Sequence, residues 1–99
     1  MGLVYLKSYD TDKGTMIACC DERLMGKTFK QGRLKLSVEN SFYGTSLLPL
    51  AEALFLLDRA DILNLVGGDI IEAAIEKGIV HPDAVIAIAG IPHVQVMRL

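Results

Sequence analysis

The sequence lacks a long apolar run, a charged leader region and a strong excess of either charge. No apolar run approaches the ~18 residues that suggest a membrane span, and Met1 leads directly into a strand-like segment. A secretory signal would need a basic and then an apolar leader. With 10 Lys and Arg against 12 Asp and Glu, the net charge of −2 argues against a protein that coats nucleic acid. We therefore expect no membrane partner.

Cysteine is also scarce, because Cys19 and Cys20 are the two in the chain and they are adjacent. Neighbours in a strand point to opposite faces, so a disulfide between them would be strained, and a reducing cytoplasm is the expected location. His81 and His93 could complete a four-ligand zinc set, but the paired spacing that zinc sites use is missing. We expect neither a metal site nor a cofactor.

What the chain does have is material for a core: 52% of its 99 residues are hydrophobic and the mean hydropathy is +0.39. This length predicts a single domain over residues 1–99. In the first half, β-rich runs at residues 3–9 and 15–20 flank a five-residue turn and predict a hairpin. Alternation at residues 34–38 predicts a further strand. The first forty residues are thus predicted to form an antiparallel sheet with one solvent-exposed face.

The second half predicts helices. Ser46 is positioned to cap a largely buried helix over residues 47–60, with Pro49 tolerated in its first turn. Asp69 is positioned to cap a second helix that ends at Gly78. Strands are expected at residues 62–66, 84–89 and 93–99, and residues 62–89 fit one strand–helix–strand crossover. The predicted fold is α+β, a mostly antiparallel sheet with two main helices packed on one face.

One basic cluster surrounds Phe29 and is followed by a tyrosine in a surface loop. Several cations on one strand face can bind nucleic-acid phosphates, and exposed aromatics can stack on bases. The alternative is a solvated face whose lysines discourage edge pairing. The predicted nucleic-acid-binding residues are Lys27, Lys30, Arg33, Lys35 and Tyr43.

A second hypothesis is a small thiol-dependent or hydrolytic enzyme. Cys20 would be the nucleophile beside a helical turn that Asp21 begins, and His93 would be the base. Its alternative is an inert cysteine, with Asp21 simply capping the turn over residues 21–25.

A third candidate site is Gly67 and Gly68, which precede a helix N-terminus and could bind an anion. The chain has no Gly-x-Gly-x-x-Gly or P-loop motif, so structural glycines are the alternative. The apolar helix over residues 47–60 could also dock another protein, which would make the chain a structural interaction module.

Four stretches together resemble the archaeal family catalogued as domain of unknown function 424. They are residues 20–29 (CDERLMGKTF), 42–44 (FYG), 64–67 (NLVG) and 90–95 (GIPHVQ). The resemblance implies an archaeal cytoplasmic protein of one domain, without established catalytic residues and with a suggested role in RNA binding. Thr45 departs from the pattern, where a second glycine is expected after Gly44. The leading functional prediction is therefore a binding module for RNA or a ribonucleoprotein.

Overall fold

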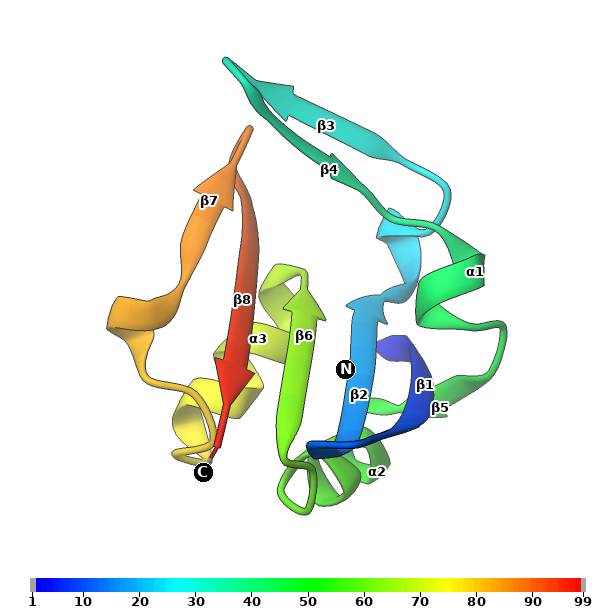
Figure 1. The fold of residues 1–99 in the computed structure, drawn as a ribbon. Helices are drawn as coiled ribbons and strands as arrows, with labels where there is room; N and C mark the ends of the chain where they lie inside the picture. The colour runs from blue at the N-terminus through cyan, green and yellow to red at the C-terminus, as the bar shows by residue number, and fades with distance from the viewer. Residues whose placement is uncertain (1, 99) are drawn as a thin grey trace.

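The computed structural model describes residues 2–98 and begins with a long antiparallel hairpin (Figure 1). Strand β1 (Leu3–Thr11) pairs along its length with β2 (Gly14–Asp21). The predicted hairpin is therefore confirmed. Its turn is shorter than the five residues predicted, because the ladder continues to the Thr11–Gly14 pair and leaves Asp12 and Lys13 between the strands.

Six strands form the main sheet, in the order β5-β1-β2-β6-β8-β7. All neighbours in it are antiparallel except β2 and β6, which are parallel. This confirms the mostly antiparallel sheet. The remaining strands are β5 (Leu47–Pro49), β6 (Ile62–Val66), β7 (Ile86–Ile88) and β8 (Ile91–Met97).

Two helices cover one face of this sheet, α2 (Leu50–Leu57) and α3 (Gly68–Glu76), which confirms the predicted layers. Their apolar side chains form a core with alternate residues of the strands; Leu57, Ile70, Leu63 and Leu65 are all fully buried. Chain order β6, α3, β7 also contains the predicted crossover. Because β8 is antiparallel to both β6 and β7, the latter two run parallel with β8 inserted between them.

The opposite face is covered in part by a second hairpin, β3 (Thr28–Gln31) and β4 (Leu34–Ser37), and by the short α1 (Asn40–Tyr43). Figure 1 shows this hairpin arching over one end of the sheet. It is a separate two-stranded sheet, so the expectation that the first forty residues form one sheet with a wet face is wrong. The covered residues Ala18, Cys20 and Val66 form a second core with side chains of the hairpin and α1.

The predicted helix over residues 47–60 is wrong at its start. Residues 47–49 form β5, which pairs with β1, and Ser46 caps nothing. Pro49 explains the difference, because proline pushes the preceding residue toward extended backbone, and Pro49 itself is extended at φ −60° and ψ 145°. The helix is also less buried than predicted: Ala53 and Leu57 are buried, while Phe55 is 65% exposed.

The strands at the C-terminal end differ in length from those predicted. Strand β7 is shorter, and β8 starts two residues earlier than expected, at Ile91. Ala89 and Gly90 form the turn between them with φ of 52° and 80°, the positive values that a type I′ hairpin requires. The predicted strand end at residue 99 lies outside the described residues.

Cys19 and Cys20 face opposite cores and are both free thiols, as the strand alternation predicted. Within residues 2–98, no group of three metal-ligating side chains comes together. In the same range, no helix is long and apolar enough to cross a membrane.

Candidate nucleic-acid interface

The β3–β4 hairpin has one apolar face and one basic face. Phe29 pairs with Leu36, and both pack onto the sheet, with Leu36 buried and Phe29 half-buried. Lys30 pairs with Lys35 one position further along, so both lysines point the other way and are exposed. Directly opposed side chains have Cβ atoms about 4.5–5.5 Å apart. The alternating sequence of the hairpin thus places two lysine side chains next to each other on its outer face.

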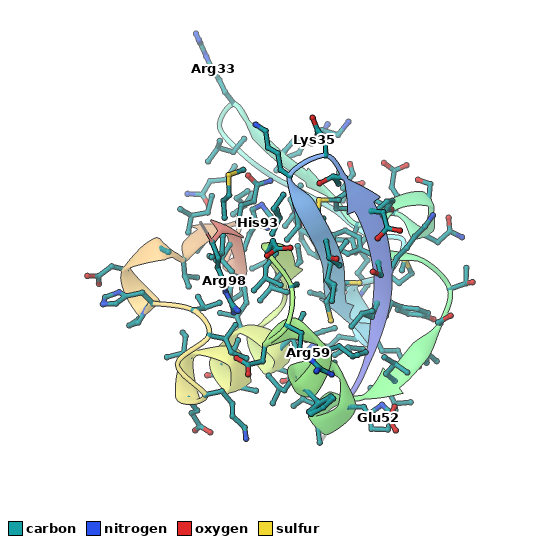
Figure 2. The ribbon with its side chains drawn as sticks, turned by 60° about the horizontal axis from the view of Figure 1, so that its bottom comes forward. Arg33, Lys35, Glu52, Arg59, His93 and Arg98 are labelled. Atoms are coloured by element: carbon teal, nitrogen blue, oxygen red, sulfur yellow. The ribbon has the colours of Figure 1, made fainter. Side chains whose placement is uncertain are left out.

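The turn of the hairpin adds a third cation. Gly32 has φ +60° at the first turn position, as a type II′ turn requires, and Arg33 follows it. Figure 2 shows Arg33 at the tip of the hairpin, projecting away from the rest of the molecule. Lys27 is exposed at the other end, just before β3. The structure therefore places all four predicted basic residues on one hairpin.

Among residues 2–98, these cations have no anionic partner. The ion pairs among residues 2–98 involve Arg23 and His81, and none involves the hairpin. Like charges that oppose each other across a strand pair are destabilising. The Lys30–Lys35 pair therefore carries a repulsion that a bound anion would relieve.

Hydrogen bonds close the hairpin at its base and attach it to the β7–β8 turn near its tip. At its base, the Val38 N–H donates to the Lys27 carbonyl at 2.9 Å, and the Gly26 N–H donates to the Val38 carbonyl at 2.7 Å. Near its tip, the side-chain carbonyl of Gln31 accepts the Ala89 N–H at 2.7 Å. The Gln31 bond, together with the packing of Phe29 and Leu36 onto the sheet, holds the basic face relative to the sheet. Sequence reasoning missed Gln31, because its partner is 58 residues away and no local pattern signals it.

Tyr43 does not join the basic surface. Its side chain is 2% exposed and packs over the sheet, and its hydroxyl donates to Asn64 Oδ1 at 2.7 Å. Burial raises the pKa of this phenol above its ordinary value. The hydroxyl is thus committed to Asn64 and is not presented to a ligand.

Cys20 and His93, the predicted nucleophile and base, lie on the same face of the sheet but are not in contact. Cys20 pairs with Val66, and Val66 pairs with His93, so Val66 stands between them. Two strand spacings put the backbones of Cys20 and His93 about 10 Å apart. His93 Nδ1 lies 3.0 Å from the Leu65 carbonyl oxygen, so this nitrogen carries the proton and donates.

The thiol of Cys20 is also in the wrong surroundings for a nucleophile. Its side chain is fully buried, and this burial, with the nearby Asp21 carboxylate, raises its pKa to about 12. A reactive cysteine needs the opposite, an electropositive and accessible site that favours the thiolate. The geometry therefore supports the inert reading of Cys20.

Asp21 caps a helix, but not the turn that follows it. Its Oδ2 accepts the Asp69 N–H at 2.9 Å and its Oδ1 accepts the Ile70 N–H at 3.0 Å, both in the first turn of α3. The carboxyl is 1% exposed, and burial is the main cause that raises its pKa above the ordinary value. The predicted cap by Asp69 is wrong, since that side chain makes no capping bond and instead pairs with Arg23 at 3.1 Å.

Asp21 also bears on the predicted anion site at Gly67 and Gly68. The helix N–H groups that would bind a phosphate there are taken by the Asp21 carboxylate. Gly67 has φ +116°, and a Cβ on it would lie 2.3 Å from Asp21 Cγ. The structural role of Gly67 is therefore evident: it leaves room for the capping carboxylate.

The observations define a class of protein: an α+β domain whose sheet carries helices on one face and a basic hairpin over part of the other. The chain belongs to the family described as Protein of unknown function (DUF424), whose model matches residues 9–99. The family resemblance seen in the four sequence stretches is thereby confirmed.

A similar fold occurs in a crystal structure described as that of an uncharacterized conserved protein from Methanopyrus kandleri. The TM-score is 0.75 at 22% sequence identity, and the alignment covers 98% of this chain and 94% of that chain. No curated protein matches the sequence. At this identity the likeness shows the fold alone, so the function is argued from the residues of this chain.

Proposed function

We propose that this protein is a binding module for RNA, alone or within a ribonucleoprotein, and that the outer face of the β3–β4 hairpin contacts the phosphates. The observation that carries the proposal is the opposed pair Lys30 and Lys35, which has no carboxylate partner in the part of the chain that the structure describes. Phosphate contacts from several cations supply most of the affinity of such proteins. Arg33 adds a planar guanidinium that can bind a phosphate with two parallel hydrogen bonds.

The charge distribution favours a local site over diffuse attraction. The whole chain carries −2, so its overall field does not draw RNA to every surface. The basic residues of the hairpin form a narrow projection, which suits a few consecutive phosphates of a flexible strand. No aromatic side chain stands on this outer face, because Phe29 packs inward. The proposal is therefore one of backbone contact without base stacking.

A matched pair of double variants tests this proposal. Lys30→Gln with Lys35→Gln removes the opposed cations, while Lys13→Gln with Lys77→Gln removes two exposed lysines elsewhere. Affinity for a labelled single-stranded RNA of mixed sequence is measured by fluorescence anisotropy at several salt concentrations. Each lost contact flattens the slope of log affinity against log salt by ~0.7, so the hairpin variant should lose about 1.4.

The control variant should keep the slope of the wild type, because its lysines lie outside the hairpin. Equal losses in the two variants would show diffuse attraction without a site. No binding by the wild type at low salt would overturn the RNA proposal. Circular dichroism confirms beforehand that both variants keep the fold.

A further inference from the structure

Helix α2 and the two residues after it present one exposed face. This face is apolar at its centre and charged at its two ends. The face consists of residues at positions i, i+3, i+4 and i+7, which lie on one side of a helix. Phe55 is 65% exposed and Leu56 is 38% exposed, and these two form the centre. Glu52 and Arg59 flank them, also exposed, and Figure 2 shows both on the surface that α2 presents.

The two charges at the ends of this face have no oppositely charged partner in the described range of the chain. Neither Glu52 nor Arg59 takes part in an ion pair among residues 2–98. Arg59 instead places its guanidinium over the Phe55 ring, at 5.4 Å from the ring centre. A hollow of about 440 Å³ beside the helix is lined by Ala51, Glu52, Phe55 and Leu56. This hollow is open to solvent, so a side chain from another protein can enter it.

This face is complementary to itself when two copies run antiparallel. The midpoint between Glu52 and Arg59 coincides with the midpoint between Phe55 and Leu56. A twofold axis at that point brings Glu52 of each copy to Arg59 of the other, and Phe55 of each to Leu56 of the other. Arg59 lies two residues beyond the end of α2, and its guanidinium over Phe55 keeps it on the same face. Seven positions at helical rise span about 10 Å, so both ion pairs flank a single apolar contact.

We propose that α2 is a homodimer interface, in which two copies of this chain pair through the face formed by Glu52, Phe55, Leu56 and Arg59. Such an isologous contact is the commonest form of self-association. A face of two helical turns is at the small end of protein interfaces, below about 1,200 Å², so the dimer is weak and concentration-dependent. Because α2 lies at the opposite end of the molecule from the β3–β4 hairpin, the dimer leaves both basic faces open (Figure 1).

Charge reversal tests whether the partner is a second copy of this chain and whether the two copies of α2 run antiparallel. In sedimentation velocity over about 1 µM to about 1 mM protein, the wild type should shift from monomer toward dimer. Glu52→Arg alone puts two cations on the face and Arg59→Glu alone puts two carboxylates there. Each variant by itself should associate at least about tenfold more weakly, because two like-charge contacts form in every dimer.

An equimolar mixture of the two single variants should associate again, since each chain now complements the other. The double variant with both reversals should also recover self-association. Phe55→Ala should abolish the dimer while circular dichroism stays native, because this side chain is mostly solvent-exposed. A wild type that remains monomeric throughout, or a mixture that fails to recover, would overturn the proposal. A different protein that binds α2 would leave the wild type monomeric and so counts against it as well.

Discussion

The carboxylate of Asp21 lies so close to Gly67 that a Cβ at position 67 would be 2.4 Å from its Oδ2. The contact follows from the register of the parallel strands β2 and β6, in which the last pair is Cys20 with Val66. Asp21 is the last residue of β2 and Gly67 is the first residue after β6, so they are neighbours at the same end of the sheet. Two of the stretches that carry the family resemblance, residues 20–29 and 64–67, therefore meet at this capping contact.

The first prediction concerns which aspartate stabilises α3. Asp21→Ala should lower the free energy of unfolding by about 1.5–3 kcal/mol, because two N–H groups of the helix lose a charged acceptor. Asp69→Ala should cost less than about 1 kcal/mol, because it removes only a favourable charge near the helix N-terminus and a surface ion pair. Urea denaturation of the two variants provides the comparison. Equal costs would contradict the assignment of Asp21 as the cap.

The second prediction concerns the glycine that accommodates this cap. Gly67→Ala should destabilise the protein by at least about 2 kcal/mol, since φ is +116° and the new methyl group would overlap Asp21. Gly68→Ala is the matched control, because a Cβ there meets open space and φ is not positive. Alanine in the first turn of α3 should leave stability unchanged or raise it by up to about 1 kcal/mol. A tolerated Gly67→Ala would show that Asp21 can move aside.

The layers of the fold follow from local patterns in the sequence. Alternation at residues 34–38 is sufficient to place Lys35 on the face opposite Leu36. The apolar run at residues 62–66, closed by two glycines, correctly predicts a buried strand. These features depend on neighbours a few residues apart, so a basic strand face could be predicted from sequence, whereas the separate two-stranded sheet of β3 and β4 could not.

Local sequence patterns do not show which residues far apart in the chain contact each other. The Asp21 carboxylate reaches N–H groups 48 and 49 residues away, so an aspartate nearer the helix, Asp69, was the natural prediction. Tyr43 is predicted to lie in a surface loop, yet its side chain is buried and its hydroxyl donates to Asn64. Pro49 likewise ends a strand here, because β1 offers an edge for residues 47–49 to join. In each case, a residue far away in the sequence decides which of the locally possible structures forms.

The last prediction distinguishes the binding module from a thiol enzyme. The pKa of Cys20 is raised from an ordinary 9.0 to about 12, so near pH 8 the thiolate is about a thousandfold scarcer than in an ordinary cysteine. Since the thiolate is the reacting species, labelling by a thiol reagent should be slow in the native protein by at least this factor. The native rate should rise about tenfold for each pH unit, because deprotonation lies above the accessible pH range.

Mass spectrometry of peptides separates labelling at Cys20 from labelling at Cys19, whose pKa burial also raises. The control is the same protein in strong denaturant, where both cysteines should react at the rate of a free thiol. His93→Ala should leave the native rate unchanged, because Val66 separates the imidazole from the sulfur. A native Cys20 that reacts faster than a free thiol, and slows when His93 is replaced, would instead establish an activated nucleophile and favour the enzyme.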